Sequence, residues 1–74
     1  MKKTFVIEVG NQPGVLYRLV NVFYKRKINI SAVNAFETKD KSISQVSITT
    51  DVSKEMAEKI NKQIYKIIEV IGVK

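Results

Sequence analysis

The chain has 74 residues, 45% of them hydrophobic, and carries a formal net charge of +6 with neither cysteine nor histidine. This length allows a single small domain over residues 1–74, near the lower bound for a stable core, so we expect self-association to add stability. The missing residue types exclude disulfides, thiolate or imidazole catalysis and the usual zinc sites. No apolar stretch approaches the ~20 residues of a membrane span, and Glu8 interrupts the first one, so we expect a cytoplasmic protein without membrane contact.

The positive charge by itself would favour a nucleic-acid-binding protein. The thirteen basic residues are spread along the chain, however. Only two of them are arginine, the residue best suited to bidentate contacts with phosphates and bases. We therefore interpret the lysines as a solvated surface and predict no nucleic-acid partner.

The first predicted element is a strand. Apolar and polar residues alternate over residues 3–9, with Phe5, Ile7 and Val9 on one side, as in a half-buried strand. A tight turn is expected next, at residues 11–14 with the sequence NQPG. Proline fixes its own φ angle and glycine adopts conformations that other residues avoid, so the chain can reverse there.

A helix is predicted from about residue 14 to residue 26, on apolar residues spaced at three and four. The stripe that we expect in the core consists of Leu16, Leu19, Val20 and Phe23, widened by Val15 and Val22. The basic run at residues 25–27 is expected in the last turn, where cations suit the helix dipole. At the other end, Gly14 leaves backbone N–H groups approachable where the dipole favours an anion, which makes the turn a candidate site for a small amino acid.

Four further elements complete the pattern. Strands are expected at residues 30–38 and 43–50, joined by a polar hairpin turn at residues 39–42. Asp51 and Ser53 are helix-start residues for a second helix. Its apolar positions are Met56, Ala57, Ile60, Ile64 and Ile67. A last strand is expected at residues 68–73.

The order βαββαβ predicts an α+β, ferredoxin-like fold, with one four-stranded antiparallel sheet, both helices on one face and the strand order 4-1-3-2. The second strand is then an edge, and its apolar residues occur on both faces. This pattern indicates either that the second face is covered or that a bulge shifts the register midway. We expect a second copy of the chain to cover it, in a homodimer paired through the second-strand edges.

The motif N-x-P-G-V-L-x-R-L-x-x-x-F-x-x-R-x-x-N-I, from Asn11 to Ile30, resembles ACT domains, which are small-molecule-binding regulatory modules. More narrowly, it resembles the N-terminal ACT domain of the acetolactate synthase (acetohydroxyacid synthase) small subunit. The resemblance implies a non-catalytic regulatory subunit of a thiamine-diphosphate-dependent enzyme, with the catalytic large subunit as its partner and no cofactor or metal of its own. It also implies that valine or another branched-chain amino acid binds at the dimer interface, for feedback inhibition of branched-chain amino acid biosynthesis.

By position in the motif, the implied ligand-binding residues are Asn11, Gly14, Val15 and Leu16 from one copy and Asn29 and Ile30 from the other. Most such subunits carry a further C-terminal domain, whereas we expect a single ACT module here. A free-standing ACT protein that binds another small ligand is therefore an alternative.

Two other functions occur on the same βαββαβ plan. An RNA-binding module needs aromatic residues on both central strands, and Phe5 is the one aromatic residue there. A small enzyme of the acylphosphatase type needs a phosphate-binding loop with an arginine, which the NQPG turn lacks.

Overall fold

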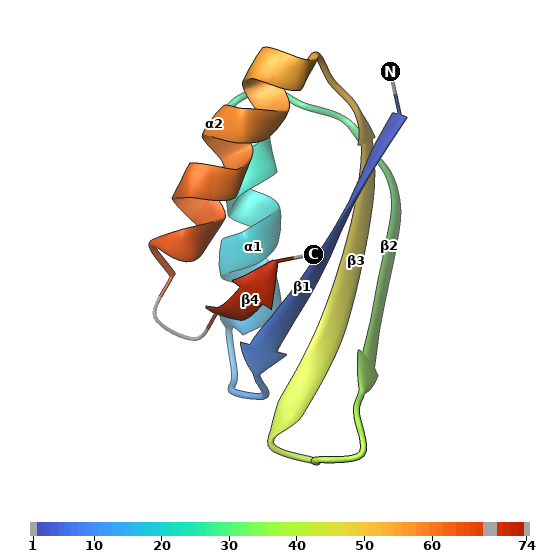
Figure 1. The fold of residues 1–74 in the computed structure, drawn as a ribbon, viewed down its shortest axis with the longest axis vertical. Coiled ribbons are helices and arrows are strands. Elements are labelled where there is room, and N and C mark those ends of the chain that lie inside the picture. The colour runs from blue at the N-terminus through green and yellow to red at the C-terminus, as the bar shows by residue number, and fades with distance from the viewer. Residues whose placement is uncertain (1, 68–69, 74) are drawn as a thin grey trace.

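The structure is a computed structural model that describes residues 2–67 and 70–73. Its elements are β1 (Lys2–Gly10), α1 (Val15–Tyr24), β2 (Ile30–Glu37), β3 (Ile43–Asp51), α2 (Lys54–Tyr65) and β4 (Val70–Val73). The strands form one antiparallel sheet in the order β2-β3-β1-β4, and both helices lie on one face of it (Figure 1). The predicted ferredoxin-like arrangement, strand order and edge position of β2 are confirmed. Of the last strand expected at residues 68–73, residues 68 and 69 lie outside the described residues.

The core lies between the sheet and the two helices. The alternation predicted for the first strand is confirmed, because Phe5, Ile7 and Val9 are buried on the helix side. They pack with buried residues of the other elements, namely Val46 and Ile48 of β3, Val15, Leu19 and Phe23 of α1, and Ala57, Ile60 and Ile64 of α2. The rings of Phe5 and Phe23 meet edge to face with centroids 5.4 Å apart, joining β1 to α1.

The apolar face of α1 differs from the predicted stripe. Leu16 is 43% exposed, and the buried positions are Val15, Leu19 and Phe23, at intervals of four. The expectation that Leu16 and Val20 belong to the core is therefore wrong, since Val20 is only half-buried and lines a surface hollow instead. Apolar residues cover two adjoining faces of this helix, so periodicity does not decide which of them meets the sheet.

The end of α1 also differs from the prediction. The helix ends at Tyr24, so the basic run follows the helix rather than forming its last turn. The Lys27 amide donates to the Tyr24 carbonyl at 2.9 Å and the Ile28 amide donates to the Phe23 carbonyl at 3.1 Å. Lys27 adopts a left-handed φ of 56°. These features form a Schellman motif with lysine at the position that glycine usually occupies.

The two helix-start residues predicted for α2 have different roles. Ser53 caps the helix, because its Oγ accepts a hydrogen bond from the Met56 amide at 3.1 Å. Asp51 instead ends β3.

β2 pairs with β3 on one side, and no described strand pairs with its other edge. Seven of its eight residues are exposed, including Val33 at 41% and Phe36 at 54%. The register shifts between Ile30 and Ala32, so the strand has an irregularity at its start, not midway along it as one sequence interpretation expected.

Candidate functional site

The turn before α1 depends on the backbone conformation of Gly14. This residue has φ 84° and ψ −8°, in the left-handed region, and it is the N-cap of the helix. A Cβ atom placed there would meet nothing within 4 Å. The backbone conformation, rather than a lack of space, therefore favours glycine at this position.

The first turn of α1 presents two backbone amides that have no partner within the described part of the chain. The Val15 amide donates to the Gln12 carbonyl at 3.3 Å, and the Arg18 amide donates to the Gly14 carbonyl at 3.1 Å. Between them, the amides of Leu16 and Tyr17 donate no hydrogen bond to a described residue. The first turn holds no acidic residue. The end of the helix can therefore accept an anion from outside the chain.

A hollow of about 180 Å³ lies beside this turn. It is lined by Val9, Gly10, Asn11, Gln12, Gly14, Val15, Leu16, Ala35, Ser44 and Val46. The structure thus brings together the four turn residues predicted from the sequence, Asn11, Gly14, Val15 and Leu16. The lining combines polar side chains of the turn and of Ser44 with apolar side chains, of which Val9, Val15 and Val46 are each at most 3% exposed.

Asn11 is held in place by the hairpin turn between β2 and β3. Its amide donates to the Ser42 carbonyl at 2.7 Å, and its Nδ2 donates to the Lys41 carbonyl at 3.3 Å. The Oδ1 atom of Asn11 accepts no hydrogen bond from a described residue, so it can accept one from an ammonium group.

The hairpin turn is itself fixed by Asp40. Its Oδ1 accepts hydrogen bonds from the Ser42 hydroxyl at 2.6 Å and from the Ser42 amide at 2.9 Å. Both hydrogen bonds stabilise the ionised form of Asp40 and so hold its pKa below the usual value. The bond from the Ser42 hydroxyl has the larger effect and the bond from the Ser42 amide the smaller one. The turn therefore presents a fixed backbone to Asn11.

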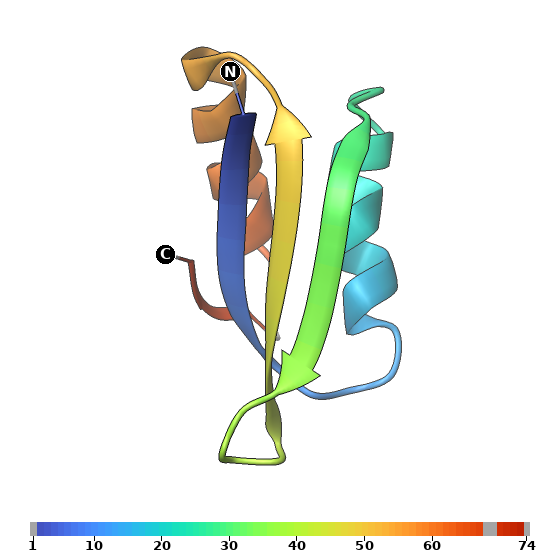
Figure 2. The same cartoon turned by 90° about the vertical axis from the view of Figure 1, so that its right-hand side faces the viewer.

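The other two predicted residues, Asn29 and Ile30, lie at the opposite end of the sheet from this hollow. β1 and β2 both pair antiparallel with β3, so they run in the same direction, and the turn follows the end of β1 whereas Asn29 precedes the start of β2 (Figure 1, Figure 2). A hydrogen bond of 2.7 Å from Lys2 Nζ to Ser31 Oγ ties the two strand starts together. Within one chain, Asn29 and Ile30 do not reach the hollow.

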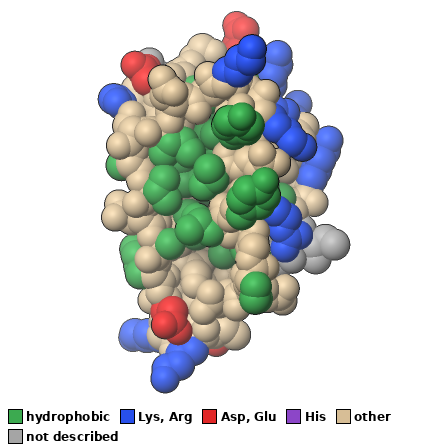
Figure 3. All heavy atoms as spheres, turned by 180° about the vertical axis from the view of Figure 1, so that it is seen from behind, with side chains coloured by type: hydrophobic (Ala, Val, Ile, Leu, Met, Phe, Trp, Pro, Cys, Tyr) green, Lys and Arg blue, Asp and Glu red, His purple; other side chains and the backbone are tan. Residues whose placement is uncertain are grey.

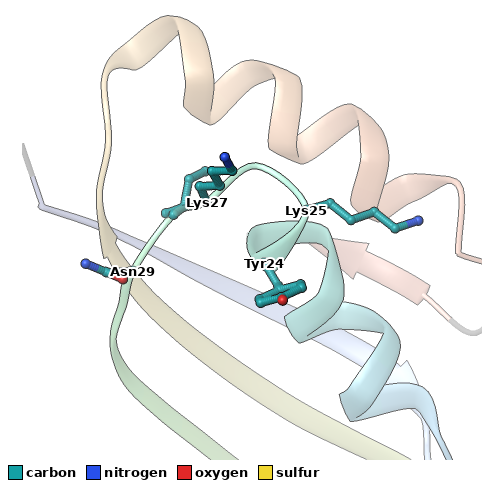
Figure 4. Close-up of a pocket in the computed structure, with 5 residues that line it drawn as sticks. Tyr24, Lys25, Lys27 and Asn29 are labelled. Carbon is teal, nitrogen blue, oxygen red and sulfur yellow. The ribbon is translucent and has the colours of Figure 1, made fainter.

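Asn29 lines a larger hollow of about 420 Å³, together with Tyr24, Lys25, Lys27 and Ile28. The side chains of Tyr24, Lys25, Lys27 and Asn29 point in different directions there and do not converge on a common point (Figure 4). A small-molecule site needs polar groups that converge. The hollow beside Gly14 is therefore the better candidate site, although it is the smaller.

The face formed by α1 and β2 carries exposed apolar side chains. Seen from behind, hydrophobic side chains gather at its centre, and most of its lysine and arginine side chains lie toward one margin (Figure 3). Tyr17 is 73% exposed and Tyr24 is 77% exposed, and both line a further hollow of about 400 Å³ with Val20 and Asn21. This face adjoins the unpaired edge of β2.

Neither a membrane-spanning helix nor a group of metal-binding side chains is found in the described part of the chain. None of its helices is long and apolar enough to cross a membrane. Among the same residues, no three histidine, cysteine, aspartate or glutamate side chains are grouped so as to hold a metal ion.

Comparison with known proteins identifies the family. The sequence model described as "AHAS small subunit-like ACT domain" matches residues 5–72. The chain belongs to this ACT domain family. The resemblance seen in the N-x-P-G motif is thereby confirmed.

Named relatives agree with this assignment. The acetolactate synthase small subunit of Buchnera aphidicola subsp. Baizongia pistaciae is 40% identical over 67 residues, which cover 90% of this chain and 42% of the relative. The acetolactate synthase isozyme 3 small subunit of Escherichia coli is 29% identical over 73 residues, covering 99% of this chain and 45% of the relative. The chain thus spans less than half the length of these relatives.

Solved structures confirm the fold. The crystal structure of the acetolactate synthase small subunit from Thermotoga maritima superposes with a TM-score of 0.89 at 31% identity, covering 100% of this chain and 46% of that one. The ACT domain from GTP pyrophosphokinase of Chlorobium tepidum superposes with a TM-score of 0.81 at 16% identity, covering 100% of this chain and 95% of that one, which shows the shared fold alone.

Six residues of the hollow beside Gly14 were not predicted from the sequence: Val9, Gly10, Gln12, Ala35, Ser44 and Val46. Strand alternation places Val9 and Val46 on the helix side but does not show that the start of α1 leaves a gap above them. Ala35 joins the lining through its pairing with Val46, which depends on the register between β2 and β3.

Proposed function

We propose that this ACT domain binds valine or another branched-chain amino acid where two copies of the chain meet, and that binding regulates an acetolactate synthase catalytic subunit. The observation that carries the proposal is the mixed polar and apolar lining of the hollow beside Gly14. Among its lining residues, Leu16 has an amide without a partner in the described part of the chain, Asn11 offers a carboxamide, and the apolar wall includes buried valines. An amino acid with an aliphatic side chain likewise combines polar and apolar groups.

The ligand is seated by three kinds of contact. Its carboxylate accepts hydrogen bonds from the amides of Leu16 and Tyr17, where the helix dipole favours negative charge. Its ammonium group donates to Oδ1 of Asn11. Its side chain lies against Val9, Val15 and Val46. Gly14 allows the backbone to turn at the carboxylate without a side chain in the way.

A second copy completes the site. When the free edges of two β2 strands pair antiparallel, the start of one strand lies next to the end of the other. Asn29 and Ile30 of the second copy are thereby carried from their own end of the sheet toward the hollow. The exposed apolar side chains of β2, Val33 among them, favour such pairing, as do the small size of the domain and the general tendency of free edges to pair.

Regulation follows from linkage between ligand binding and the arrangement of the pair. A ligand held between two copies stabilises one arrangement, and this changes how the pair docks on the catalytic large subunit. Such couplings are typically ~1–3 kcal/mol, roughly 5–150-fold in affinity. The proposal comprises a single ACT module over residues 1–74 that acts in the cytoplasm, feedback inhibition by the end product, and no catalytic residue, cofactor or metal of its own.

A thermal-shift screen of the twenty amino acids tests the ligand. A compound that binds only the folded pair raises its melting temperature, and we expect the largest shifts with valine, leucine and isoleucine. Calorimetric titration of these three then gives the affinity and the number of sites. The absence of heat with all three would refute the proposal. A shift with another compound class would instead support a free-standing ACT protein with a different ligand.

Mixed dimers test whether the site draws on two copies. Gly14→Asp and Asn29→Ala each damage one half of the site, so each homodimer should bind weakly. When the two variants are mixed and exchanged, every mixed dimer regains one site in which both halves are intact. Recovered valine binding in the mixture supports the two-copy site. If the mixture binds no better than its components, Asn29 does not act across the pair.

RNA binding gains no support from the arrangement of aromatic residues. Phe5 is fully buried on the helix side of β1, and β3 contains no aromatic residue. The outer face of the two central strands therefore lacks the side chains on which RNA bases stack.

A further inference from the structure

The edge strand contributes one small residue to the wall of the hollow beside Gly14. Ala35 pairs with Val46 in the register of β2 and β3, so both side chains project to the helix side. Val46 is 2% exposed, whereas Ala35 is exposed at the open edge of the sheet. Ala35 is the one β2 residue among those that line the hollow in the described part of the chain.

The other apolar walls are fixed by the core. Val9, Val15 and Val46 belong to β1, α1 and β3, and they pack in the central hydrophobic cluster. A larger residue at any of these three positions would disturb the core. The wall toward β2 is different, because it consists of a single methyl group next to an unpaired strand edge.

We propose that Ala35 sets the size of the aliphatic side chain that the site accepts. The inference rests on the proposed function, since it concerns the same hollow. The volume of the hollow is about 180 Å³, and atoms added to the side chain of Ala35 reduce it directly. One methylene more or less in an apolar pocket changes affinity by roughly 10–200-fold.

The test compares Ala35→Val with wild type over a series of amino acids of increasing size. Valine suits a strand and adds two carbon atoms to the wall, so the variant should fold. We expect it to lose at least about tenfold in affinity for leucine and isoleucine relative to alanine or 2-aminobutyrate, measured by calorimetry. The substitution thus shifts the preference toward amino acids with smaller side chains and does not lower the affinity for all amino acids equally.

Ala32→Val is the matched control. Ala32 lies on the same strand and pairs with Thr49, but it does not line the hollow. Its side chain projects to the face of the sheet away from the helices, so the same atoms are added on the same strand edge but away from the hollow. We expect Ala32→Val to keep the wild-type order of affinities.

The outcomes separate this inference from the proposed function. An unchanged size preference in Ala35→Val would overturn the role of Ala35 while leaving amino acid binding in place. Equal losses in Ala35→Val and Ala32→Val would also overturn it, because strand pairing would then be the cause. If no amino acid binds wild type, the proposed function fails and this inference fails with it. Should Ala35→Val melt below the assay temperature, Ala35→Ser adds one atom, and we expect the same shift against leucine and isoleucine, in smaller degree.

Discussion

Both ends of α1 pass through the left-handed region of backbone conformation, but with different residues. Before the helix, Gly14 has φ 84°, and after it, Lys27 has φ 56°. Glycine adopts this conformation without a steric penalty, whereas a residue with a Cβ atom pays ~1–2 kcal/mol. The first end opens onto the hollow that is lined by Asn11 and Leu16, and the second onto a hollow whose side chains diverge (Figure 4).

The difference indicates what each end does. At Gly14 the backbone itself faces the hollow, and two amides have no partner within the described part of the chain. At Lys27 the backbone groups are used internally, because the amides of Lys27 and Ile28 close the end of the helix. An open end can bind a ligand, whereas a closed end stabilises the fold. The following predictions test this contrast.

Gly14→Asp tests the open end and should have the largest effect. Its carboxylate would lie where the proposed site holds the carboxylate of the ligand, so we expect the affinity for valine to fall about a hundredfold, as for the loss of hydrogen bonds to a charged group. Gly14→Asn is the control, because asparagine has nearly the same shape, tolerates left-handed φ and carries no charge. Calorimetry on both variants separates charge from geometry. Equal affinities for valine in the two variants would show that charge at this end is irrelevant.

Thr50→Val tests the closed end, where Thr50 pairs with Ile30. The Thr50 hydroxyl is fully buried and has no hydrogen-bond partner among the described residues. Removing a buried, unsatisfied hydroxyl should raise the free energy of unfolding by about 1 kcal/mol, measured by urea denaturation. Thr49→Val is the control, because the Thr49 hydroxyl lies 2.9 Å from that of Thr4, in hydrogen-bond contact. A loss of stability in Thr50→Val would mean that the hydroxyl is satisfied after all.

Lys27→Gly should relieve the strain at the same end. We expect a gain of about 0.5–1 kcal/mol, since the removed strain is partly offset by the greater entropy of glycine in the unfolded chain. For a domain of this size, that gain corresponds to a rise of several degrees in melting temperature. Lys25→Gly is the control. Lys25 has a helical φ of −60°, so glycine there should lower stability instead. If both variants lose stability, the left-handed turn at Lys27 is not strained.

Asp40→Asn, in the hairpin turn that holds Asn11, should have the smallest effect on stability. Hydrogen bonds from Ser42 lower the pKa of Asp40 in the folded state, so its contribution to stability is complete above the unfolded pKa, near 3.8. The contribution is lost as the pH falls through the lower, folded pKa. We expect a slight additional decrease in stability below about pH 3.8 in wild type. Asp40→Asn should not show this additional decrease. Identical profiles of stability against pH for the two proteins would contradict the stabilising role of the ionised Asp40.

Much of the fold could be predicted from the sequence because its signals are local. Alternation at Phe5, Ile7 and Val9 predicted β1, and the order of elements predicted the sheet. The errors arose where the outcome depends on packing between elements. Leu16 was expected in the core, but periodicity alone did not show that Val15 would face the sheet instead.

The candidate site was predicted in part for the same reason. Proline and glycine in the NQPG turn identified Asn11 and Gly14, since turn chemistry is local. Ala35 and Ser44 enter the hollow through strand register, which is a property of paired strands. The left-handed φ of Lys27 could not be predicted either, because lysine gives no sign of positive φ. The same holds for the Thr50 hydroxyl, which has no partner among the described residues, because threonine is common in strands.

Because β1 and β2 run in the same direction, the two halves of the proposed site lie at opposite ends of each molecule. Under the proposed function, a monomer therefore has no complete site and does not respond to the metabolite. Sensitivity to the metabolite then rises with the concentration of the protein, and the response is lost when the protein is diluted below the dissociation constant of the dimer. Substitutions on β2 away from the hollow would thus change the potency of the metabolite without contacting it.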